Sequence, residues 1–330
     1  MEEEKEIAEE GNNFDEGWKE IIGEYFPQLM EFFFPEIHKD IDYTKDYEFL
    51  DIELQKIVKL SNLGKRWADR LIKVYLHNGH EKWILIHIEI QGYYDNEFTK
   101  RMYVYNYRIF DCYGIEVISL AILADDQESF RPNRYEVAYW GFRHTFEFPT
   151  VKLLDYLKKW EELEKSTNPF GIVVMAHLKS LQTKNNDSER LFWKITLVKR
   201  LYEKGYSKED VLNLYRFIDW VIGLPKELKR QFNDEVIKYE EGKKMPFITT
   251  AESIGIEKGI EKGREEGRNE GRKEGLREAI DLGLKLKFGL DGLELMPEVE
   301  KIISIERLRL VKEAIVIASE LEEVKRIVRH

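Results

Sequence analysis

Residues 67–91, WADRLIKVYLHNGHEKWILIHIEIQ, contain two runs of alternating side chains that decide the fold. In the second run the even positions from Ile84 to Ile90 are all isoleucine, and the odd positions carry Leu85, His87, Glu89 and Gln91. This period of two is typical of a β-strand with one apolar face. In the first run the even positions hold Ala68, Ile72, Val74 and Leu76, with Arg70 as the exception. The stretch therefore predicts a β-hairpin with its even positions facing the core.

The parity of the two runs determines how they pair. A shift of one residue would turn every side chain to the opposite face, so even positions must pair with even and odd with odd. A two-residue turn at Asn78-Gly79 breaks this rule, whereas a three-residue loop over residues 78–80 obeys it. With that loop the numbers of paired residues add up to 158, and we expect Asp69 directly opposite Glu89.

Asp69 and Glu89 would bring two carboxylates together. Directly opposed residues have Cβ atoms roughly 4.5–5.5 Å apart, so the two charges repel unless something positive lies between them. A hard divalent cation such as Mg²⁺ takes oxygen ligands and is the simplest candidate. The alternative is an exposed strand face with ordinary solvated acids.

The composition of the 330 residues is that of a globular chain, with 43% hydrophobic residues. The net charge of −11 argues against nonspecific binding of nucleic acid. The acidity is concentrated in residues 1–60, which contain 18 Asp and Glu against 6 Lys and Arg, whereas residues 64–125 contain 8 of each. The predicted hairpin therefore lies outside the acidic part.

A single cysteine, Cys112, excludes a disulfide framework and a cysteine zinc cluster, and it favours a reducing compartment. The first residues, MEEEKEIAEE, do not have the basic and then apolar pattern of a signal peptide. No uncharged apolar run approaches the roughly 18 residues that a membrane span requires. We expect a cytoplasmic protein that does not enter the membrane.

The segments around the hairpin predict alternating helices and strands. Helical spacing of apolar residues follows a plausible cap at Asp15, and Pro27 and Pro35 divide this region into short helices. Residues 47–60, with Asp51 and Glu53, are predicted as a strand or strand-like turn. After the hairpin we expect a helix over 95–112 that Gly114 ends and a buried strand over 115–124. A strand over 135–146 and a helix over 151–163 follow.

From residue 166 to about residue 242 the apolar spacing is helical throughout, with polar interruptions. Ser207 predicts the capped start of a helix that ends at Ile222. We interpret this region as a small helical subdomain. The aromatic residues in it are predicted to form its core rather than a ligand site.

Six glycines from Gly255 to Gly275 recur at every fourth position, separated by charged triplets. Each interior glycine costs a helix roughly 0.5–1 kcal/mol relative to alanine, so another interaction has to compensate. The spacing gives a smooth, slanted helix face that a second helix can approach closely. The charges between the glycines exclude a lipid bilayer. We expect a self-association helix in water; the alternative is a flexible, partly helical linker.

Five segments of this chain, taken in order, carry a resemblance to a known family: FLDIEL (49–54), ADRLIKVYL (68–76), ILIHIEIQG (84–92), FTKRMYVYNYRIF (98–110) and VISLAILAD (117–125). An Asp on one strand and a Glu-x-polar pattern on its neighbour, followed by a helix, is the layout of PD-(D/E)XK nucleases. The ordered set resembles the recombination-promoting nuclease and putative transposase family of that superfamily. The glycine repeat and the helical tail also resemble those of its members.

The resemblance implies an α/β fold with a restriction-endonuclease-like core, in which helices flank a mixed central sheet. A helical region and a long glycine-repeat helix follow this core. The predicted organisation is an acidic leader (1–13), a PD-(D/E)XK nuclease-like domain (14–165), the helical subdomain (166–250), the glycine-repeat helix (251–285) and a C-terminal helical tail (286–330).

The resemblance also implies roles for individual residues. Asp69 and Glu89 would bind the catalytic metal, Mg²⁺ or Mn²⁺, and Gln91 would occupy the position of the superfamily's lysine. The N-terminal acid of the pattern falls on Glu53, with Glu20 and Glu24 as alternatives.

Gln91 departs from the pattern, because glutamine can form hydrogen bonds but cannot supply the positive charge of a lysine. Lys73, Lys100 or Arg101 could supply that charge, and each of them is a candidate phosphate contact. Arg101 could equally pair with an acid of the site. His87 projects to the same side as a candidate base or, as is more usual for a strand histidine, a structural residue.

The expected function is metal-dependent hydrolysis of DNA phosphodiester bonds, linked to recombination or mobile elements, by an endonuclease that self-associates through the helix over Gly255–Gly275. The alternative is a catalytically reduced relative that uses the same fold for DNA binding or assembly. Neither a P-loop nor a dinucleotide-binding glycine pattern occurs in the chain, so ATP hydrolysis and hydride transfer have no support.

Overall fold

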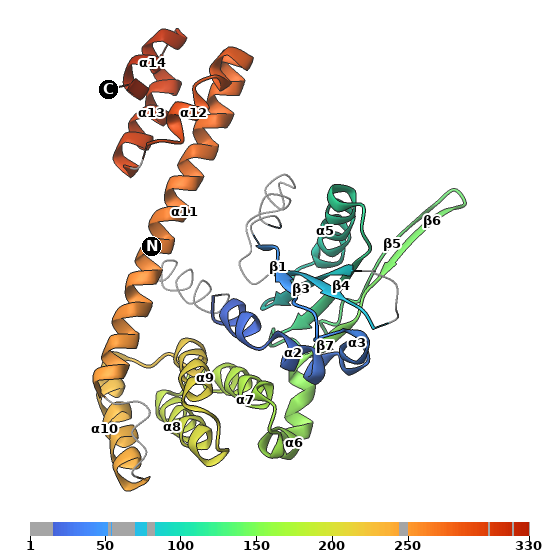
Figure 1. Ribbon diagram of the computed structural model, residues 1–330, viewed down its shortest axis with the longest axis vertical. Coiled ribbons are helices and arrows are strands. Elements are labelled where there is room, and N and C mark those ends of the chain that lie inside the picture. The colour runs from blue at the N-terminus through green and yellow to red at the C-terminus, as the bar shows by residue number, and fades with distance from the viewer. Residues whose placement is uncertain are drawn as a thin grey trace. The chain divides into compact units, whose positions relative to one another are not determined.

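We examined the protein in a computed structural model, which describes residues 16–51, 54, 70–77, 83–243, 250–302, 304–318 and 320–329. The chain divides into two compact units, Met1–Phe247 and Ile248–His330. The first unit contains the sheet and the second is helical (Figure 1).

A mixed sheet of five strands forms the centre of the first unit, in the order β1-β2-β3-β4-β7. The strands are β1 (Glu48–Phe49), β2 (Arg70–Tyr75), β3 (Trp83–Gln91), β4 (Val117–Leu123) and β7 (Thr150–Lys152). β1, β2 and β3 run antiparallel, whereas β4 is parallel to β3 and β7 is parallel to β4. The predicted α/β class with a mixed sheet is therefore confirmed.

β2 and β3 pair in the predicted register. Arg70 lies opposite Ile88 and Tyr75 lies opposite Trp83, so every observed pair adds up to 158. Asp69 and the predicted loop over 78–80 lie outside the described residues. The register is confirmed for residues 70–75 and 83–88, and its extension to Asp69 and Glu89 stays a prediction.

Helix α5 (Phe98–Tyr113) covers the face of the sheet that carries the odd-numbered residues of β3. Tyr105 and Ile109 of α5 pack against Leu71 and Leu85. Nearer the start of the helix, Phe98 and Met102 pack against Ala121 and Leu123 of β4. This face is consequently buried along β3 from Leu85 to Gln91. The strand has the predicted apolar face, and its polar face is buried as well.

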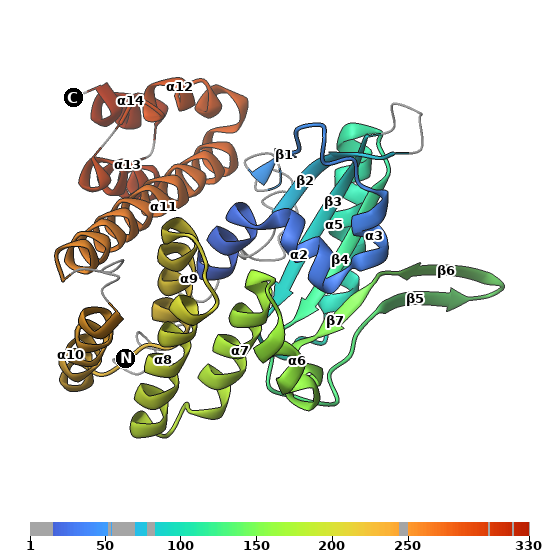
Figure 2. The same cartoon turned by 60° about the horizontal axis from the view of Figure 1, so that its bottom comes forward.

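The opposite face carries buried aliphatic residues of the three central strands, namely Ile72, Val74, Ile86, Ile88, Ile90, Leu120 and Ile122. The helices α2 (Phe26–Phe33) and α3 (Pro35–Asp40) cover it, and α7 (Pro169–Gln182) packs beside α2 (Figure 2). Proline occupies the first turn of α2 and of α3, where the missing N–H has no intrahelical partner to lose. The predicted division of this region into short helices is confirmed.

Arg70, the exception in the predicted alternation, joins the sheet to the N-terminal helix over residues 16–24. Its Nε donates to the carbonyl oxygen of Lys19 at 3.1 Å, and its Nη1 binds the Asp51 carboxylate. A Cβ at position 23 would lie 2.7 Å from the guanidinium, so Gly23 allows this close approach. The guanidinium of Arg70 on this otherwise apolar face is therefore paired with two specific acceptors.

Two predictions for the segment after β4 are wrong. Residues 135–146 form a hairpin of two strands, β5 (Arg134–Tyr139) and β6 (Phe142–Glu147), instead of one strand. Trp140 and Gly141 make the turn with φ of 50° and 83°. This two-residue turn was missed because tryptophan is an unusual residue at a positive φ.

The segment predicted as a helix over 151–163 begins in strand β7 and continues as a 3₁₀ helix, η1 (Leu153–Lys159), and α6 (Trp160–Lys165). Its first residues form a strand because they pair with β4, and this tertiary pairing outweighs the helical spacing of their apolar side chains. In the predicted strand or turn over 47–60, the described residues 47–51 and 54 contain strand β1, and Asp51 is helical; the rest of the range lies outside the described residues.

The helical region consists of α7, α8 (Asp187–Glu203), α9 (Lys208–Val221) and α10 (Lys226–Lys243). Ser207 caps α9 by accepting a hydrogen bond from the Asp210 backbone N–H, as predicted. The region packs on the N-terminal part of the chain: the Tyr25 hydroxyl donates to Asp210 at 2.7 Å, and Arg216 pairs with Glu20 at 2.9 Å. It shares one compact unit with the sheet.

The second unit consists of α11 (Thr250–Leu293), α12 (Met296–Val299), α13 (Ile305–Ile317) and α14 (Leu321–Arg329). Its core is formed by residues of all four helices and of the segments between them: Ile280, Leu284, Leu295, Val299, Ile302, Leu308, Val311, Ile315, Ala318, Val324 and Val328. The glycine repeat lies in α11, so its helical interpretation is confirmed. A Cβ at Gly255, Gly267 or Gly275 would meet nothing within 4 Å. In the described ranges, no helix has the length and apolar character needed to cross a membrane.

Candidate functional site

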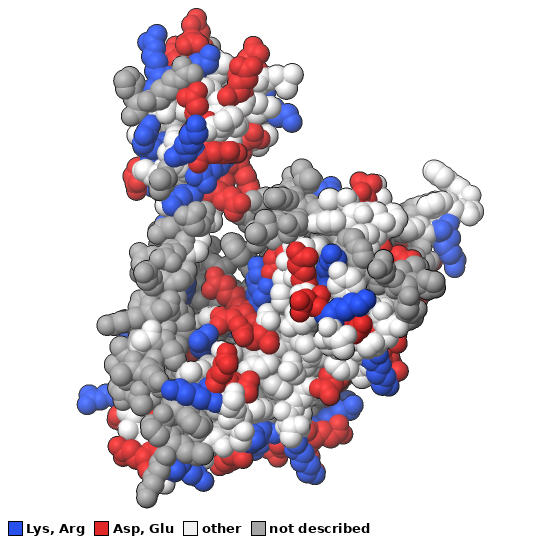
Figure 3. Space-filling model, viewed as in Figure 1, with Lys and Arg blue, Asp and Glu red and all other residues white. Residues whose placement is uncertain are grey.

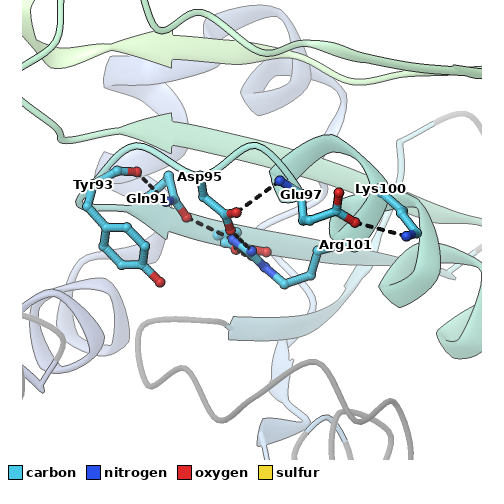
Figure 4. A network of polar contacts seen from close by, with 7 residues as sticks. Gln91, Tyr93, Asp95, Glu97, Lys100 and Arg101 are labelled. Atoms are coloured by element: carbon cyan, nitrogen blue, oxygen red, sulfur yellow. Dashed lines mark hydrogen bonds and ion pairs between the residues drawn. The ribbon is translucent and has the colours of Figure 1, made fainter.

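Four polar side chains meet beneath the start of α5. Glu89 and Gln91 lie at the end of β3, and the period of the strand directs both toward α5. Arg101 lies in the first turn of α5 and points back toward the sheet (Figure 4). Asp95 lies in the connecting turn, where its Oδ1 accepts a hydrogen bond from the Glu97 backbone N–H at 2.9 Å. We call these four residues the Arg101 cluster.

The guanidinium of Arg101 holds the cluster together (Figure 4). Its Nε and Nη2 donate to Oε1 of Glu89 at 3.0 Å and 2.6 Å, and Nη2 also donates to Oε1 of Gln91 at 2.8 Å. Its Nη1 binds the carboxylate of Asp95. The Gln91 amide in turn donates to the carbonyl oxygen of Tyr93. One cation therefore contacts two carboxylates and one amide.

Three of the four residues of the cluster are almost completely removed from solvent, and Asp95 is partly buried. Glu89 and Gln91 are each 1% exposed and Arg101 is 2% exposed. The alternative interpretation, an exposed strand with solvated acids, therefore does not hold for Glu89. Burial alone would lower the pKa of the Arg101 guanidinium, but the carboxylates of Glu89 and Asp95 outweigh it and raise that pKa above its usual value. Arg101 stays charged, as the buried acids require.

His87 lies two residues before Glu89 on the same face of β3. It is fully buried; its Nδ1 lies 3.3 Å from the Ser119 hydroxyl, and its ring meets Tyr105 edge to face. Burial, assisted by the charge of Arg101, lowers the pKa of His87 to about 3. The neutral ring is a poor proton acceptor at pH 7 because its conjugate acid is too strong. Its geometry suits a structural role.

No protein-family model, curated protein or solved structure matches this chain.

The structure brings together three of the predicted site residues, Glu89, Gln91 and Arg101. Lys100 is on the surface beside them and pairs with Glu97 at 2.9 Å (Figure 4). Lys73 lies opposite Leu85, four residues from Glu89 along the strand direction, which corresponds to about 13 Å. Lys73 therefore does not belong to the cluster.

The candidates for the N-terminal acid remain separate from the cluster or outside the described residues. Glu53 is outside the described residues, as is Asp69, the predicted metal ligand. Glu20 pairs with Arg216 of α9, and Glu24 is exposed. Neither of the two described acids contacts Glu89.

The Arg101 cluster offers carboxylate oxygens to a metal ion, but a cation already occupies its centre. In the part of the chain that the structure describes, no group of three His, Cys, Asp or Glu side chains is placed to hold a metal ion. The carboxylate oxygens of Glu89 are donors that Mg²⁺ prefers, so the donor chemistry fits. Arg101 already donates two hydrogen bonds to Oε1 of Glu89, so an ion at that oxygen requires the guanidinium to turn away.

Sequence reasoning missed Asp95 and a second buried ion pair. Asp95 precedes a helix at the position of an Asx turn, which is the signal that could have identified it. Lys152 of β7 pairs with Asp125, which follows β4, at 2.6 Å, and both side chains are buried. His177 of α7 lies 2.7 Å from the Ala124 carbonyl oxygen next to this pair. The pair depends on strands that are distant in sequence, so no local pattern reveals it.

Proposed function

We propose that this chain belongs to the recombination-promoting nuclease and putative transposase family and acts as a metal-dependent DNA endonuclease. The arrangement of elements supports the proposal. The antiparallel strands β1, β2 and β3, with β4 parallel to β3 and helices beside the sheet, are compatible with the mixed, helix-flanked sheet that the resemblance implies. Additional support comes from the five ordered segments, since each of them overlaps one of these strands or helix α5.

The observation that carries the proposal is the buried carboxylate of Glu89 on the central strand β3, next to Gln91 and below a cation. A buried acid is costly unless it is paired or has another use, so such groups gather at functional sites. Glu89 and the predicted Asp69 would hold Mg²⁺ or Mn²⁺. The bound ion would supply the Lewis acid chemistry for phosphodiester hydrolysis.

Arg101 takes the role that a lysine at position 91 would have. Its Nη2 reaches both Glu89 and Gln91, so a positive charge already lies beside the Gln91 side chain. In this proposal Arg101 turns from Glu89 toward the scissile phosphate when DNA and metal enter. Gln91 orients the attacking water through a hydrogen bond. Lys100, exposed at the edge of the cluster, contacts the DNA backbone.

The proposed partners are DNA and further copies of the chain, which associate through the helix over Gly255–Gly275. The open space at Gly255, Gly267 and Gly275 supports a close approach by another helix. Figure 3 shows Lys and Arg intermingled with Asp and Glu on the face in view, so the proposed DNA contact is local rather than a broad basic surface. The proposed compartment is the cytoplasm, because Cys112 is a free, exposed thiol.

One observation favours a second function. Because Arg101 occupies Oε1 of Glu89 and also bonds to Gln91, the cluster is satisfied internally without a metal. This is the arrangement expected of a catalytically reduced relative that retains the fold for DNA binding or assembly. The two functions differ in whether Glu89 and Asp69 bind a metal.

The test is cleavage of supercoiled plasmid in Mg²⁺ and in Mn²⁺ by the wild type, Asp69→Ala and Glu89→Gln. We expect nicking by the wild type and a loss of roughly a hundredfold or more in each variant, because each removes a proposed ligand. Glu161→Gln is the matched control, since Glu161 is an exposed acid on α6 that pairs only at the surface with Lys165. It should retain the full rate.

Metal binding is measured separately by titration calorimetry with Mn²⁺. Cleavage that is equal in the wild type and in Asp69→Ala would disprove the proposed site. Absence of both cleavage and Mn²⁺ binding would disprove the nuclease and select the second function, which then predicts a gel shift of DNA that does not depend on metal.

A further inference from the structure

The hairpin of β5 and β6 extends away from the body of the first unit (Figures 1 and 2). We call residues 134–147 the ribbon. The end of the ribbon carries three large aromatic side chains with very high exposed fractions: Tyr139 is 67% exposed, Trp140 is fully exposed at 103% and Phe142 is 63% exposed. Figure 3 shows this end as an uncharged tip. Exposed apolar groups that adjoin one another in this way mark an interaction surface.

The two faces of the ribbon differ in character. One face is made by the cross-strand pairs Tyr135 with Phe146, Val137 with His144 and Tyr139 with Phe142. Near the body, Tyr103 of α5 covers this face, with its ring 5.3 Å from that of Tyr135. Toward the tip the same face is exposed. An isolated two-stranded ribbon is marginally stable in water, so this outer half benefits from a partner.

The charged face of the ribbon argues against DNA as that partner. Arg134 lies 3.5 Å from Glu136 and 3.7 Å from Glu147, and Arg143 lies 3.7 Å from Glu136. The positive charges of the two arginines and the negative charges of the two glutamates add up to zero. Binding to a phosphate backbone depends on an excess of positive charge, which the ribbon lacks. A protein surface is the better match.

The backbone of β6 has one edge that is available for pairing. The Phe148 N–H donates to the carbonyl oxygen of Asn133 at 3.1 Å, so even-numbered residues of this strand direct their backbone groups toward β5. Backbone groups alternate along a strand, so those of residues 143, 145 and 147 point to the opposite edge. Among the described strands β6 pairs only with β5. Such an edge is a template for another strand.

The side chains on this edge are self-complementary. Arg143 and Glu147 are equally distant from Thr145 in the sequence. An antiparallel pairing of β6 with itself about a two-fold axis at Thr145 sets Arg143 opposite Glu147 of the partner subunit, and the reverse. The same pairing sets His144 opposite Phe146 of the partner subunit. Opposite charges therefore meet on one face and aromatic rings on the other.

We propose that the ribbon is a dimerisation arm that pairs through β6 with β6 of a second copy. Residues 143, 145 and 147 complete their backbone hydrogen bonds, and the two ribbons form one four-stranded sheet. The exposed aromatic tip of each ribbon then lies along the base of the other. This inference does not depend on the proposed nuclease activity, and it involves a surface other than the glycine repeat.

The first experiment measures the association of the full chain by sedimentation at increasing protein concentration. We expect a dimer for the wild type. Arg143→Glu and Glu147→Arg each place like charges opposite each other twice, and should raise the dissociation constant by roughly tenfold or more. The double variant with both substitutions restores opposite charges and should recover most of the affinity. Lys158→Glu, an exchange of an exposed residue of η1, is the control.

The second experiment addresses the backbone. Thr145→Pro removes an N–H that points away from β5, so the hairpin keeps its own hydrogen bonds while the dimer loses one from each strand. Thr145→Val retains the N–H and should dimerise. Thr145→Cys in a Cys112→Ser background should form an intermolecular disulfide, because paired residues at the axis have Cα atoms about 5.5 Å apart. Glu147→Cys in the same background should not.

A chain that stays monomeric at every concentration would overturn the proposal. So would a dimer that tolerates Thr145→Pro and both charge reversals but is lost in Gly267→Leu, since that result assigns association to α11. Circular dichroism of each variant confirms that the fold is retained.

Discussion

Arg101 pairs with two carboxylates through one guanidinium that is itself almost completely buried. Three N–H groups of the side chain are used on Glu89 and Gln91, and Nη1 is used on Asp95. Removing two charges from water costs several kcal/mol per ion, and good geometry has to offset this. Such a cluster contributes less to net stability than its number of bonds suggests, but it is sensitive to the loss of a single member.

We therefore predict that Arg101→Met lowers the free energy of unfolding by about 3–5 kcal/mol, because Glu89 loses its guanidinium partner while it remains buried. In the double variant Glu89→Gln with Arg101→Met, the loss should be smaller than the sum of the two single losses by about 2 kcal/mol. Urea unfolding followed by tryptophan fluorescence measures these values.

The matched control is Arg131→Met, which removes the exposed bidentate pair of Arg131 with Asp155. Solvent screens that pair, so its loss should be much smaller. An equal loss of unfolding free energy in Arg131→Met and Arg101→Met would contradict the expectation that burial makes the Arg101 pair more important. Additive losses in the double variant would contradict the coupling of Glu89 with Arg101.

His87 and His177 introduce a dependence on pH. Burial, as the main cause, lowers the pKa of His87 to about 3 and that of His177 to about 4. The unfolded chain binds protons on these residues below pH 6.5, whereas the folded chain does not, so stability is lost as the pH falls below 6.5. Between pH 7.5 and pH 5.5 we expect a loss of about 1 kcal/mol per histidine.

His87→Gln should reduce this pH-dependent loss by about half. Urea unfolding of the wild type and of the variant at the two pH values provides the measurement. If the wild type has the same free energy of unfolding at pH 7.5 and at pH 5.5, the two histidines bind protons in the folded protein as readily as in the unfolded chain, and the prediction is wrong.

At the scale of elements, α5 is the helix that positions the cluster, and both of its ends are defined locally. It begins after the turn that holds Asp95 and ends at Gly114, whose φ of 63° lies in the left-handed region. The Gly114 N–H bonds to the Phe110 carbonyl oxygen and closes the last turn. The helix was predicted over 95–112 because these end signals act within a few residues.

Gly114→Ala should destabilise the first unit by about 1 kcal/mol, because a Cβ is unfavourable at a positive φ. Gly114→Asn should cost less, since asparagine tolerates that conformation. Gly223→Ala is the control, because a Cβ at Gly223 meets nothing within 4 Å and its φ is not positive. Thermal unfolding of the three variants tests this, and a loss in Gly223→Ala equal to that in Gly114→Ala would disprove it.

At the scale of the whole molecule, the chain consists of two units that have separate cores. All seven tryptophans, from Trp18 to Trp220, belong to the first unit. Tryptophan fluorescence therefore follows the first unit, while far-ultraviolet circular dichroism also follows the helices of the second. The two signals allow the stability of each unit to be measured in the full chain.

Gly283→Val should destabilise the second unit by about 1–3 kcal/mol, because a Cβ there would lie 3.1 Å from Cγ2 of Ile315 on α13. Gly275→Ala, at an open position of α11, should instead stabilise it by about 0.5–1 kcal/mol. Both changes should shift the circular dichroism transition and leave the fluorescence transition in place. A fluorescence transition that moves with Gly283→Val would contradict two separate cores.

Much of the fold of the first unit could be predicted from sequence. The strands β2, β3 and β4, the helix α5 and the register of β2 with β3 follow from the period and parity of residues 70–124. The turn at Trp140 and the strand β7 could not be predicted in this way. Trp140 adopts a conformation that its type disfavours, and β7 is a strand because β4 lies beside it.

Local signals along the chain are enough to show which residues alternate, where helices begin and end, and that Glu89 and Gln91 share a face of their strand. These features depend on backbone geometry and on contacts between near neighbours. The binding of Arg101 to Glu89, Gln91 and Asp95 arises in the folded protein, because the position of α5 over the sheet is set by the packing of Phe98 and Met102 on β4. Partners separated in the chain are chosen by burial, which acts on the folded molecule as a whole.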